Sequence, residues 1–449
     1  MTGDAVSSAR AVSPAQADLA EGDRTTVRVG AVAHGGHCVA RVDGQVVFVR
    51  HALPGELVTV EITETHRGYL RGDAVTVHEP APDRVEPPCR YAGPGRCGGC
   101  DLQHVTVAGQ LAWKEAVVRE QLLRLGGLTG AEVDGLAPRV RPLPGGPLGW
   151  RTRVRYTVDA ADRAGLLKHR SHEVVPVDRC LIAHPAVQGA PVLPASGRRW
   201  PVVDAVEVVA SAAGEVVVIP AGGSSRSAGA SGAGAGAPSG LPEALPEALP
   251  EALPGSVTQV TESAAGRRWR LPAGAFWQVH PAAADTLVTS VLDLLGPRPG
   301  ESAWDLYGGA GLFAAAVAGR TGPHGRVTMV ESSPAGVAAA RLNLADLPRI
   351  EVVAARVETA LTRRRITGPV DLVVLDPPRA GAGARVVAGV AAATRRAIAY
   401  VACDPAALAR DVRTFRDLGW SLTALHGYDC FPMTRHVECV ALLTPAAGR

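Results

Sequence analysis

A single cysteine in the C-terminal part of the chain has the setting of a catalytic nucleophile. Cys403 ends the strand-like run AIAYVAC and is followed by Asp-Pro, after which a helix is expected over 405–410. The positive end of that helix would lower the pKa of the thiol and favour the reactive thiolate. Such a thiolate can add to carbon 6 of a uracil ring and make carbon 5 nucleophilic, which is covalent catalysis. The alternative is a small apolar cysteine that only fills the core.

Glu438 offers the second group that this chemistry needs. After a methyl group reaches carbon 5, the proton on that carbon must leave before the thiol can be eliminated, and a general base removes such a proton. Glu438 lies in the apolar run HVECVALL, where a carboxylate is costly unless it is functional or paired. Pairing with Arg435 or His436 is the structural alternative.

Three polar strand ends predict a cofactor site. The turn DLYGGAG at 305–311 follows a strand-like run, and Gly309 and Gly311 would let a cofactor approach the backbone closely. Glu331 ends the next run, where a carboxylate can accept both hydroxyls of a ribose. Nicotinamide enzymes share these features, and a tight turn with an acidic helix start is the other explanation. The motif Asp376-Pro-Pro-Arg argues against a nicotinamide enzyme. Its two prolines end the strand and hold a loop where a target base would meet the cofactor.

Four other cysteines could hold a metal. Cys89, Cys97 and Cys100 are separated by seven and two residues, and Cys180 stands alone beside charged neighbours. Eight cysteines in a chain without a visible secretory signal argue against a set of disulfides. Four thiolates suit either zinc or an iron–sulfur cluster, with a structural or RNA-supporting role.

The sequence pattern predicts several domains that position these residues. A disordered-looking leader occupies 1–23, and 24–80 carries short apolar runs broken by turn residues, the pattern of a small β-barrel. From 268 to 449, buried strand-like runs alternate with Ala-rich helices, which predicts a doubly wound α/β domain with ligands at the carboxyl ends of its strands.

A central α+β domain is predicted over 81–267, bearing the cysteines and an RNA-binding surface. Arg151, Arg153 and Arg155 alternate along a strand-like run and so share one face, which could contact phosphates. A merely solvated face is the alternative. Gly/Ala/Ser-rich sequence and LPEA repeats at 221–255 predict a flexible insertion, since this composition cannot bury a core.

The composition argues against a membrane protein but does not decide whether the protein binds nucleic acid. The longest apolar stretches are well short of the roughly 20 residues of a membrane span, so we expect no membrane association. We also expect a cytoplasmic location, because no secretory signal is visible. The net charge of +3 is too small to indicate nucleic-acid binding by itself. Arginine supplies nearly all the positive charge, and Lys114 and Lys168 are the only lysines.

Together these motifs resemble the family of uridine-5 RNA methyltransferases that carry an N-terminal TRAM barrel. The resemblance spans about 24–443 and is most specific in FWQVH from 276, DLYGGAG from 305, DPPRAG from 376, YVACDP from 400 and HVECV from 436. It implies a Rossmann-like class I methyltransferase domain behind an OB-like TRAM barrel. It also implies S-adenosylmethionine as the methyl donor, with Cys403 as nucleophile and Glu438 as base.

The resemblance further assigns the ligand-binding residues. It implies that S-adenosylmethionine is contacted by Gln278, Tyr307, Glu331 and Asp376, and that a [4Fe-4S] cluster is bound by Cys89, Cys97, Cys100 and Cys180. The expected substrate is a uridine in tRNA or rRNA, and we expect a monomer. Two alternatives stay open: an RNA-binding protein that has lost catalysis, and an amino-group methyltransferase in which Cys403 is merely buried.

Overall fold

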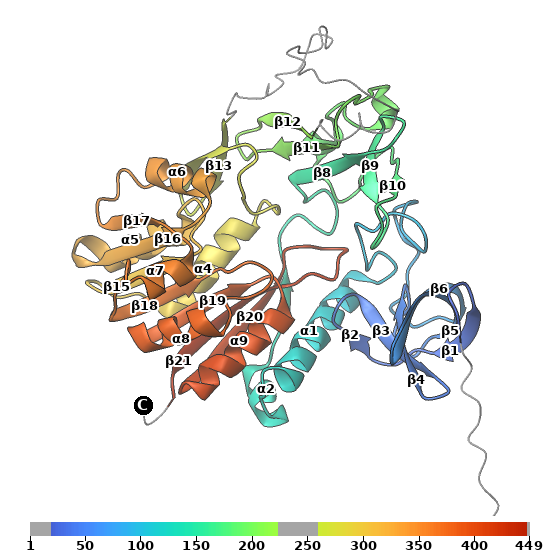
Figure 1. The fold of residues 1–449 in the computed structure, drawn as a ribbon, viewed down its shortest axis with the longest axis horizontal. Helices are drawn as coiled ribbons and strands as arrows, with labels where there is room; N and C mark the ends of the chain where they lie inside the picture. The colour runs from blue at the N-terminus through green and yellow to red at the C-terminus, as the bar shows by residue number, and fades with distance from the viewer. Residues whose placement is uncertain (1–18, 223–258, 447–449) are drawn as a thin grey trace, which may run out of the picture. The chain divides into compact units, whose positions relative to one another are not determined.

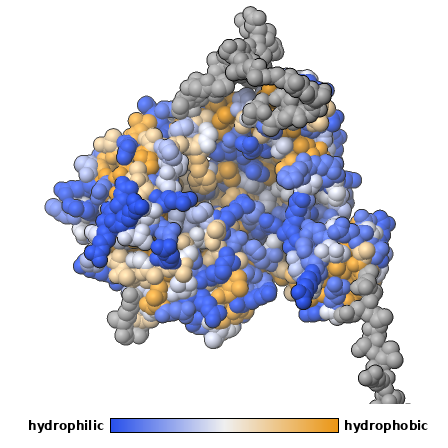
Figure 2. All heavy atoms as spheres, viewed as in Figure 1, coloured by the Kyte–Doolittle hydropathy of each residue, from blue (hydrophilic) through white to orange (hydrophobic). Residues whose placement is uncertain are grey.

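The computed structural model describes residues 19–222 and 259–446 and contains two compact units that divide after Arg84 (Figure 1). The predicted insertion at 221–255 and the leader at 1–23 lie almost entirely outside the described residues. Of the helices in those two ranges, none is long and apolar enough to cross a membrane. On the face shown in Figure 2, hydrophilic residues cover most of the described surface, and hydrophobic residues form small groups between them.

The first unit is one six-stranded sheet built from the runs that predicted a small barrel. Its strands, in spatial order, are β1 (Arg24–Arg28), β5 (Leu57–His66), β6 (Tyr69–Glu79), β4 (Gln45–Arg50), β3 (His37–Val42) and β2 (Val32–Ala33). Alternate residues of β5 are buried, namely Val58, Val60 and Ile62, as expected of a strand with one face on a core. Glu56 is fully buried at the start of β5 because Arg84 and the backbone N–H groups of Leu53 and Ala81 donate to its carboxylate.

The second unit is organised around an eight-stranded sheet. Its strands, in spatial order, are β17 (Ile350–Ala354), β16 (Arg326–Glu331), β15 (Ser302–Leu306), β18 (Val370–Leu375), β19 (Thr394–Ala402), β21 (Glu438–Pro445), β20 (Trp420–Asp429) and β7 (Val140–Pro142). The strands from β17 to β19 are parallel, whereas β21 runs antiparallel to both of its neighbours.

Helices cover both faces of this sheet, which explains its nearly continuous apolar strands. One face packs on α4 (Ala283–Leu295), α5 (Leu312–Thr321) and α6 (Pro334–Asn343). The other packs on α1 (Val107–Arg124), α2 (Gly130–Leu136), α7 (Val357–Thr362), α8 (Ala384–Ala393) and α9 (Pro405–Asp417). Successive residues of β18 alternate between the two cores: Leu372 and Val374 face the first, and Val373 and Leu375 the second.

A smaller antiparallel sheet and a hairpin complete the second unit. The sheet has the order β10 (Val174–Val175), β9 (Ala164–Leu167), β8 (Arg153–Val158), β11 (Ala205–Ala210) and β12 (Val216–Ala221). The hairpin is β13 (Gln259–Ala264) with β14 (Arg267–Pro272), and short helices lie at α3 (Pro185–Gln188), η1 (Pro194–Ser196) and η2 (Gly322–His324). The domain boundary predicted at 268 falls inside β14 and stays a prediction.

Arg153, expected on an RNA-binding face, is instead buried between β8 and the hairpin. Its side chain is 6% exposed and lies 3.0 Å from the carboxylate of Glu262, which is 7% exposed. Its guanidinium also donates to the carbonyls of Ala273 and Ala275. A phosphate contact does not fit this environment, because the charge is already paired inside the protein. Arg155, two residues on, is exposed.

Replacing Arg153 by Met should destabilise the fold. The change leaves the Glu262 carboxylate buried without its cation, which typically costs about 3–5 kcal/mol. Urea unfolding of the full chain measures this loss. Arg155→Met is the matched control and should stay within about 0.5 kcal/mol of the wild type, while adding Glu262→Met to Arg153→Met should restore part of the loss. A loss for Arg153→Met as small as that of Arg155→Met would refute the structural role.

Candidate active site

Four polar residues meet at one edge of the large sheet. Tyr307, Glu331, Asp376 and Cys403 directly follow or end β15, β16, β18 and β19. Because these strands are parallel, their carboxyl ends lie at the same edge, where ligands bind in doubly wound sheets. All four residues line one open cleft of about 880 Å³. The structure therefore brings these strand-end residues together, and their roles stay predictions.

The reversed direction of β21 brings Glu438 to the same edge. Ala402 at the end of β19 pairs with Cys439 near the start of β21, so Cys403, the first residue after β19, lies opposite Glu438. Both side chains line the cleft. The nucleophile and the base that were proposed from separate motifs are thus brought together by one strand pairing.

The pKa of the Cys403 thiol differs from the sequence-based expectation. The helix α9 begins at Pro405, as predicted, but the carboxylate of Asp404 caps it by accepting from the N–H of Ala407 at 2.8 Å. Burial and, after it, the carboxylates of Glu438, Asp376 and Asp404 together raise the pKa of Cys403 to about 11, although Arg379 acts in the opposite direction. The prediction of a lowered pKa is wrong for the free protein, because burial and three nearby acids outweigh the helix end.

The acids of the cleft are also strongly perturbed. Glu438 is 4% exposed, and burial followed by the charge of Asp376 raises its pKa well above the usual value, while Arg379 lowers it. Burial raises the pKa of Asp376 to about 7. His436 lines the same cleft, and burial together with Arg379 lowers its pKa to about 3. A neutral His436 cannot pair with Glu438 as a cation, which removes one structural explanation for this glutamate.

The glycine turn and Glu331 form a cradle in the wall of the cleft. The Glu331 carboxylate accepts from the N–H groups of Gly309, Ser332 and Ser333. Gly309 has φ +56 and lines the cleft, and a side chain there would point into open space. Gly311 also has positive φ, but it caps α5 and lies against Leu344. Gln278 lines the cleft beside this cradle, so the predicted cofactor residues other than Gly311 share one cavity.

The structure draws attention to two residues to which the sequence analysis gave no role. Phe276 lines the cleft although its side chain is 74% exposed, a setting in which an aromatic ring can stack on a base. Asp411 on α9 is buried and accepts from the hydroxyl of Tyr400 at 2.6 Å and from the N–H of Ala382 at 2.7 Å. It thereby ties the loop after Asp376 to the strand that ends at Cys403. An aspartate between the apolar Leu408 and Val412 was the available sequence signal.

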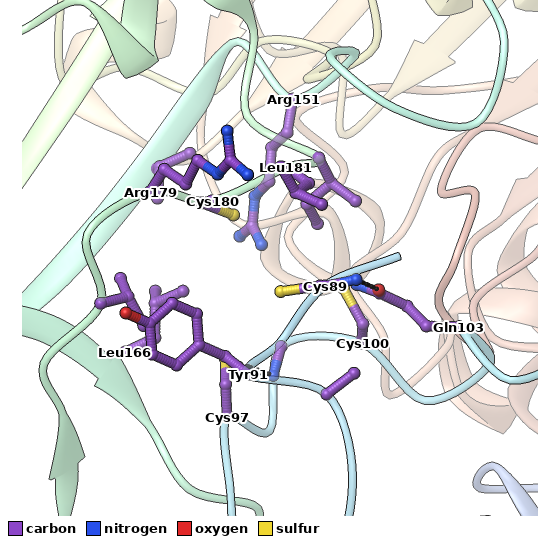
Figure 3. Close-up of a pocket in the computed structure, with 15 residues that line it drawn as sticks. Cys89, Tyr91, Cys97, Cys100, Gln103, Arg151, Leu166, Arg179, Cys180 and Leu181 are labelled. Carbon is purple, nitrogen blue, oxygen red and sulfur yellow. Dashed lines mark hydrogen bonds between the residues drawn. The ribbon is translucent and has the colours of Figure 1, made fainter. Parts of the chain in front are cut away.

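The four predicted metal ligands surround a second, smaller cavity (Figure 3). Cys89, Cys97, Cys100 and Cys180 all line it, within an apolar wall and close to the guanidinium groups of Arg151 and Arg179. Burial raises the pKa of Cys97 to about 11 and also raises the pKa values of Cys100 and Cys180. Throughout the described ranges, no three His, Cys, Asp or Glu side chains stand close enough together to hold a single metal ion.

The sequence and the fold resemble those of known proteins. Residues 19–75 match the TRAM domain family, and residues 258–446 match the family described as tRNA (Uracil-5-)-methyltransferase. A protein of Streptomyces avermitilis named as an uncharacterized RNA methyltransferase is 47% identical, covering 95% of this chain and 99% of its own. One of Bifidobacterium longum with the same description is 36% identical, covering 93% and 96%.

A solved structure shares the fold over nearly the whole chain. The crystal structure of Pyrococcus abyssi tRNA (uracil-54, C5)-methyltransferase in complex with S-adenosyl-L-homocysteine superposes with a TM-score of 0.65, covering 93% of this chain and 100% of that one. Its sequence identity of 21% makes this a likeness of fold.

Alkylation of Cys403 should follow its raised pKa. Below a pKa of about 11, the thiolate fraction grows about tenfold per pH unit, so the rate of modification by iodoacetamide should keep rising from pH 7 to pH 10. Mass spectrometry of the peptide containing Cys403 measures this rate. Arg379→Gln should slow alkylation at pH 8, because the cation that stabilises the thiolate is gone. A rate that levels off above pH 8 would show that the helix end dominates instead.

Proposed function

Since the chain belongs to the family of RNA methyltransferases that join a TRAM domain to a (uracil-5-)-methyltransferase domain, we propose that it methylates a uridine of tRNA or rRNA through a covalent adduct with Cys403. The methyl donor of this family is S-adenosylmethionine. The proposal rests on one observation: Cys403 and Glu438 line the same cleft, at the end of one strand pairing. An amino-group methyltransferase would have no use for a thiol and a buried base side by side.

The reaction begins at the thiol of Cys403. As a thiolate it adds to carbon 6 of the flipped-out uracil, and the electrons of the ring double bond move towards carbon 5 and oxygen 4. Carbon 5 then takes the methyl group, the one chemical contribution that bound S-adenosylmethionine makes. Arg379 supports this first step because it lowers the pKa of Cys403.

Glu438 completes the reaction. Its carboxylate takes the proton from carbon 5, the double bond forms again, and the bond between carbon 6 and sulfur breaks to release Cys403. The raised pKa of Glu438 suits this task, since a carboxylate with a high pKa is a stronger base once it is ionised. Because burial excludes water from the carboxylate, the carboxylate takes its proton from the substrate and not from solvent.

The same cleft provides places for the methyl donor and the RNA. Gln278, Tyr307, Glu331 and Asp376 would hold S-adenosylmethionine, with Glu331 at the ribose hydroxyls and Gly309 allowing close approach. Phe276 would stack on a base at the mouth of the cleft, and Arg151 and Arg155 would contact phosphates. The cytoplasmic location and the monomeric state stay predictions.

Covalent trapping tests the roles of Cys403 and Glu438. RNA from cells lacking this protein and grown with 5-fluorouracil should form a denaturation-resistant adduct with the wild type, because fluorine at carbon 5 cannot leave as a proton does. Cys403→Ala should form none, and the buried Cys38→Ala, in the other unit, should react as the wild type. With ordinary RNA, Glu438→Gln should retain the adduct and lose at least about 100-fold in turnover. An undiminished adduct in Cys403→Ala would exclude the mechanism.

The cavity of Cys89, Cys97, Cys100 and Cys180 would hold a [4Fe-4S] cluster. Four thiols in an apolar wall beside two guanidinium groups suit an anionic cluster. All four thiols line one cavity, as a cluster with four cysteine ligands requires, and the resemblance to cluster-bearing members of the family favours this cluster over zinc. These cysteines belong to the fold around the site and take no part in methyl transfer.

Metal analysis of protein purified without oxygen tests this ligand set. The wild type should contain about four iron and four sulfide per chain, and Cys97→Ser should lose most of both. Cys439→Ser, a buried thiol outside the cavity, is the control and should keep the wild-type content. Stoichiometric zinc with no sulfide in the wild type would refute the cluster.

A further inference from the structure

The loop between β20 and β21 carries much of the cleft. We name residues 430–437 the return loop, since the chain turns back there into the strand that begins with Glu438. Phe431, Thr434 and His436 of this loop line the cleft together with Glu438. The contacts that hold the return loop therefore set the position of Glu438, the proposed base.

Met433 at the centre of the return loop has a strained backbone. Its φ is +66, a left-handed conformation that a side chain other than glycine adopts only when its surroundings impose it. The imposing contacts come from the segment 101–114, more than 300 residues earlier. Leu102 donates its N–H to the carbonyl of Met433 at 3.0 Å, and Gln110 accepts from the N–H of Met433 at 2.9 Å and donates to its sulfur at 3.3 Å.

Lys114 binds the beginning of the return loop through its side chain. Its side chain is completely buried, and its ammonium group lies 2.5 Å from the carboxylate of Asp429 and 3.2 Å from the carbonyl of Phe431. A buried ammonium is costly unless it is paired in this way. Asp429 ends β20 and Phe431 lines the cleft, so one charged group joins the strand end to the return loop.

The choice of lysine at this position is informative in a chain that uses arginine almost everywhere. Lys114 is one of only two lysines among 46 Lys and Arg residues. The compact ammonium can donate to a carboxylate and a carbonyl in a narrow space, whereas the planar guanidinium of arginine needs a wider and flatter site. If Lys114 and Asp429 served stability alone, apolar residues of similar size could replace them at no loss of stability.

We propose that Lys114 and Gln110 are positioning residues for the methyl-transfer reaction, which hold the return loop so that Glu438 meets the proton on carbon 5. The proposal rests on the proposed function, in which Glu438 is the base. Lys114 and Gln110 act through the loop and do not touch the substrate. Their loss should slow the step that needs Glu438 more than the step that needs Cys403.

The test compares the two steps in the full-length protein. The probes are total RNA from cells lacking this protein, and the same RNA from cells grown with 5-fluorouracil. In Lys114→Met, turnover on ordinary RNA should fall at least about tenfold and a covalent adduct should accumulate. The rate of adduct formation with the fluorinated RNA should change less than about threefold, because that step does not use Glu438. Gln110→Met, which leaves the buried charge pair intact, should show the same split if Lys114→Met folds poorly.

Controls separate this inference from a loss of folding and from a failure of the proposed function. Arg119 lies on α1, as Lys114 does, and Arg119→Met removes an exposed ion pair with Asp134 of α2. This variant should behave as the wild type. Wild-type turnover in both Lys114→Met and Gln110→Met, or an equal loss of adduct formation and turnover, would overturn the positioning role. If the wild type itself forms no adduct with the fluorinated RNA, the proposed function fails first.

Discussion

Antiparallel hydrogen bonds between β19 and β21 place the last strand of the large sheet beside the strand that ends at Cys403. Parallel strands alone would bring only their carboxyl ends to this edge. Because β21 runs the other way, its first residue, Glu438, arrives there too. Cys403 and Glu438, the proposed nucleophile and base, are 35 positions apart in the chain but share one cleft, and the loops after β15, β16 and β18 complete its walls.

The electrostatics of this cleft is dominated by burial. Cys403, Asp376 and Glu438 all have raised pKa values, and Arg379 is the cation that opposes the shift for both Cys403 and Glu438. Burial disfavours the charged forms of all three groups. The thiol of Cys403 is therefore mostly protonated at neutral pH in the ligand-free cleft, and substrate binding must supply part of the environment that ionises it.

The N-terminal half of the second unit supports this cleft from outside the sheet. Asp101 and Leu102 follow Cys100 directly and hydrogen-bond to the return loop at Arg435 and Met433. Gly99 and Arg151 line both the cysteine cavity and the cleft. The cysteine cavity and the cleft are therefore neighbours through a short stretch of backbone. The backbone just after Cys100 is thus joined by hydrogen bonds to the loop that precedes Glu438.

The local sequence predicted the strands of the large sheet and the polar residues at their ends. Apolar runs that end in polar residues predicted the strands and placed Glu331, Asp376 and Cys403 at their ends, because strand length and alternation are local properties. The start of α9 at Pro405 followed from Asp-Pro for the same reason. The pKa of Cys403, the burial of Arg153 beside Glu262 and the pairing of Lys114 with Asp429 were decided only by the tertiary structure. Burial and charge environment depend on segments that are distant in sequence, and no local pattern specifies which of them will pack together.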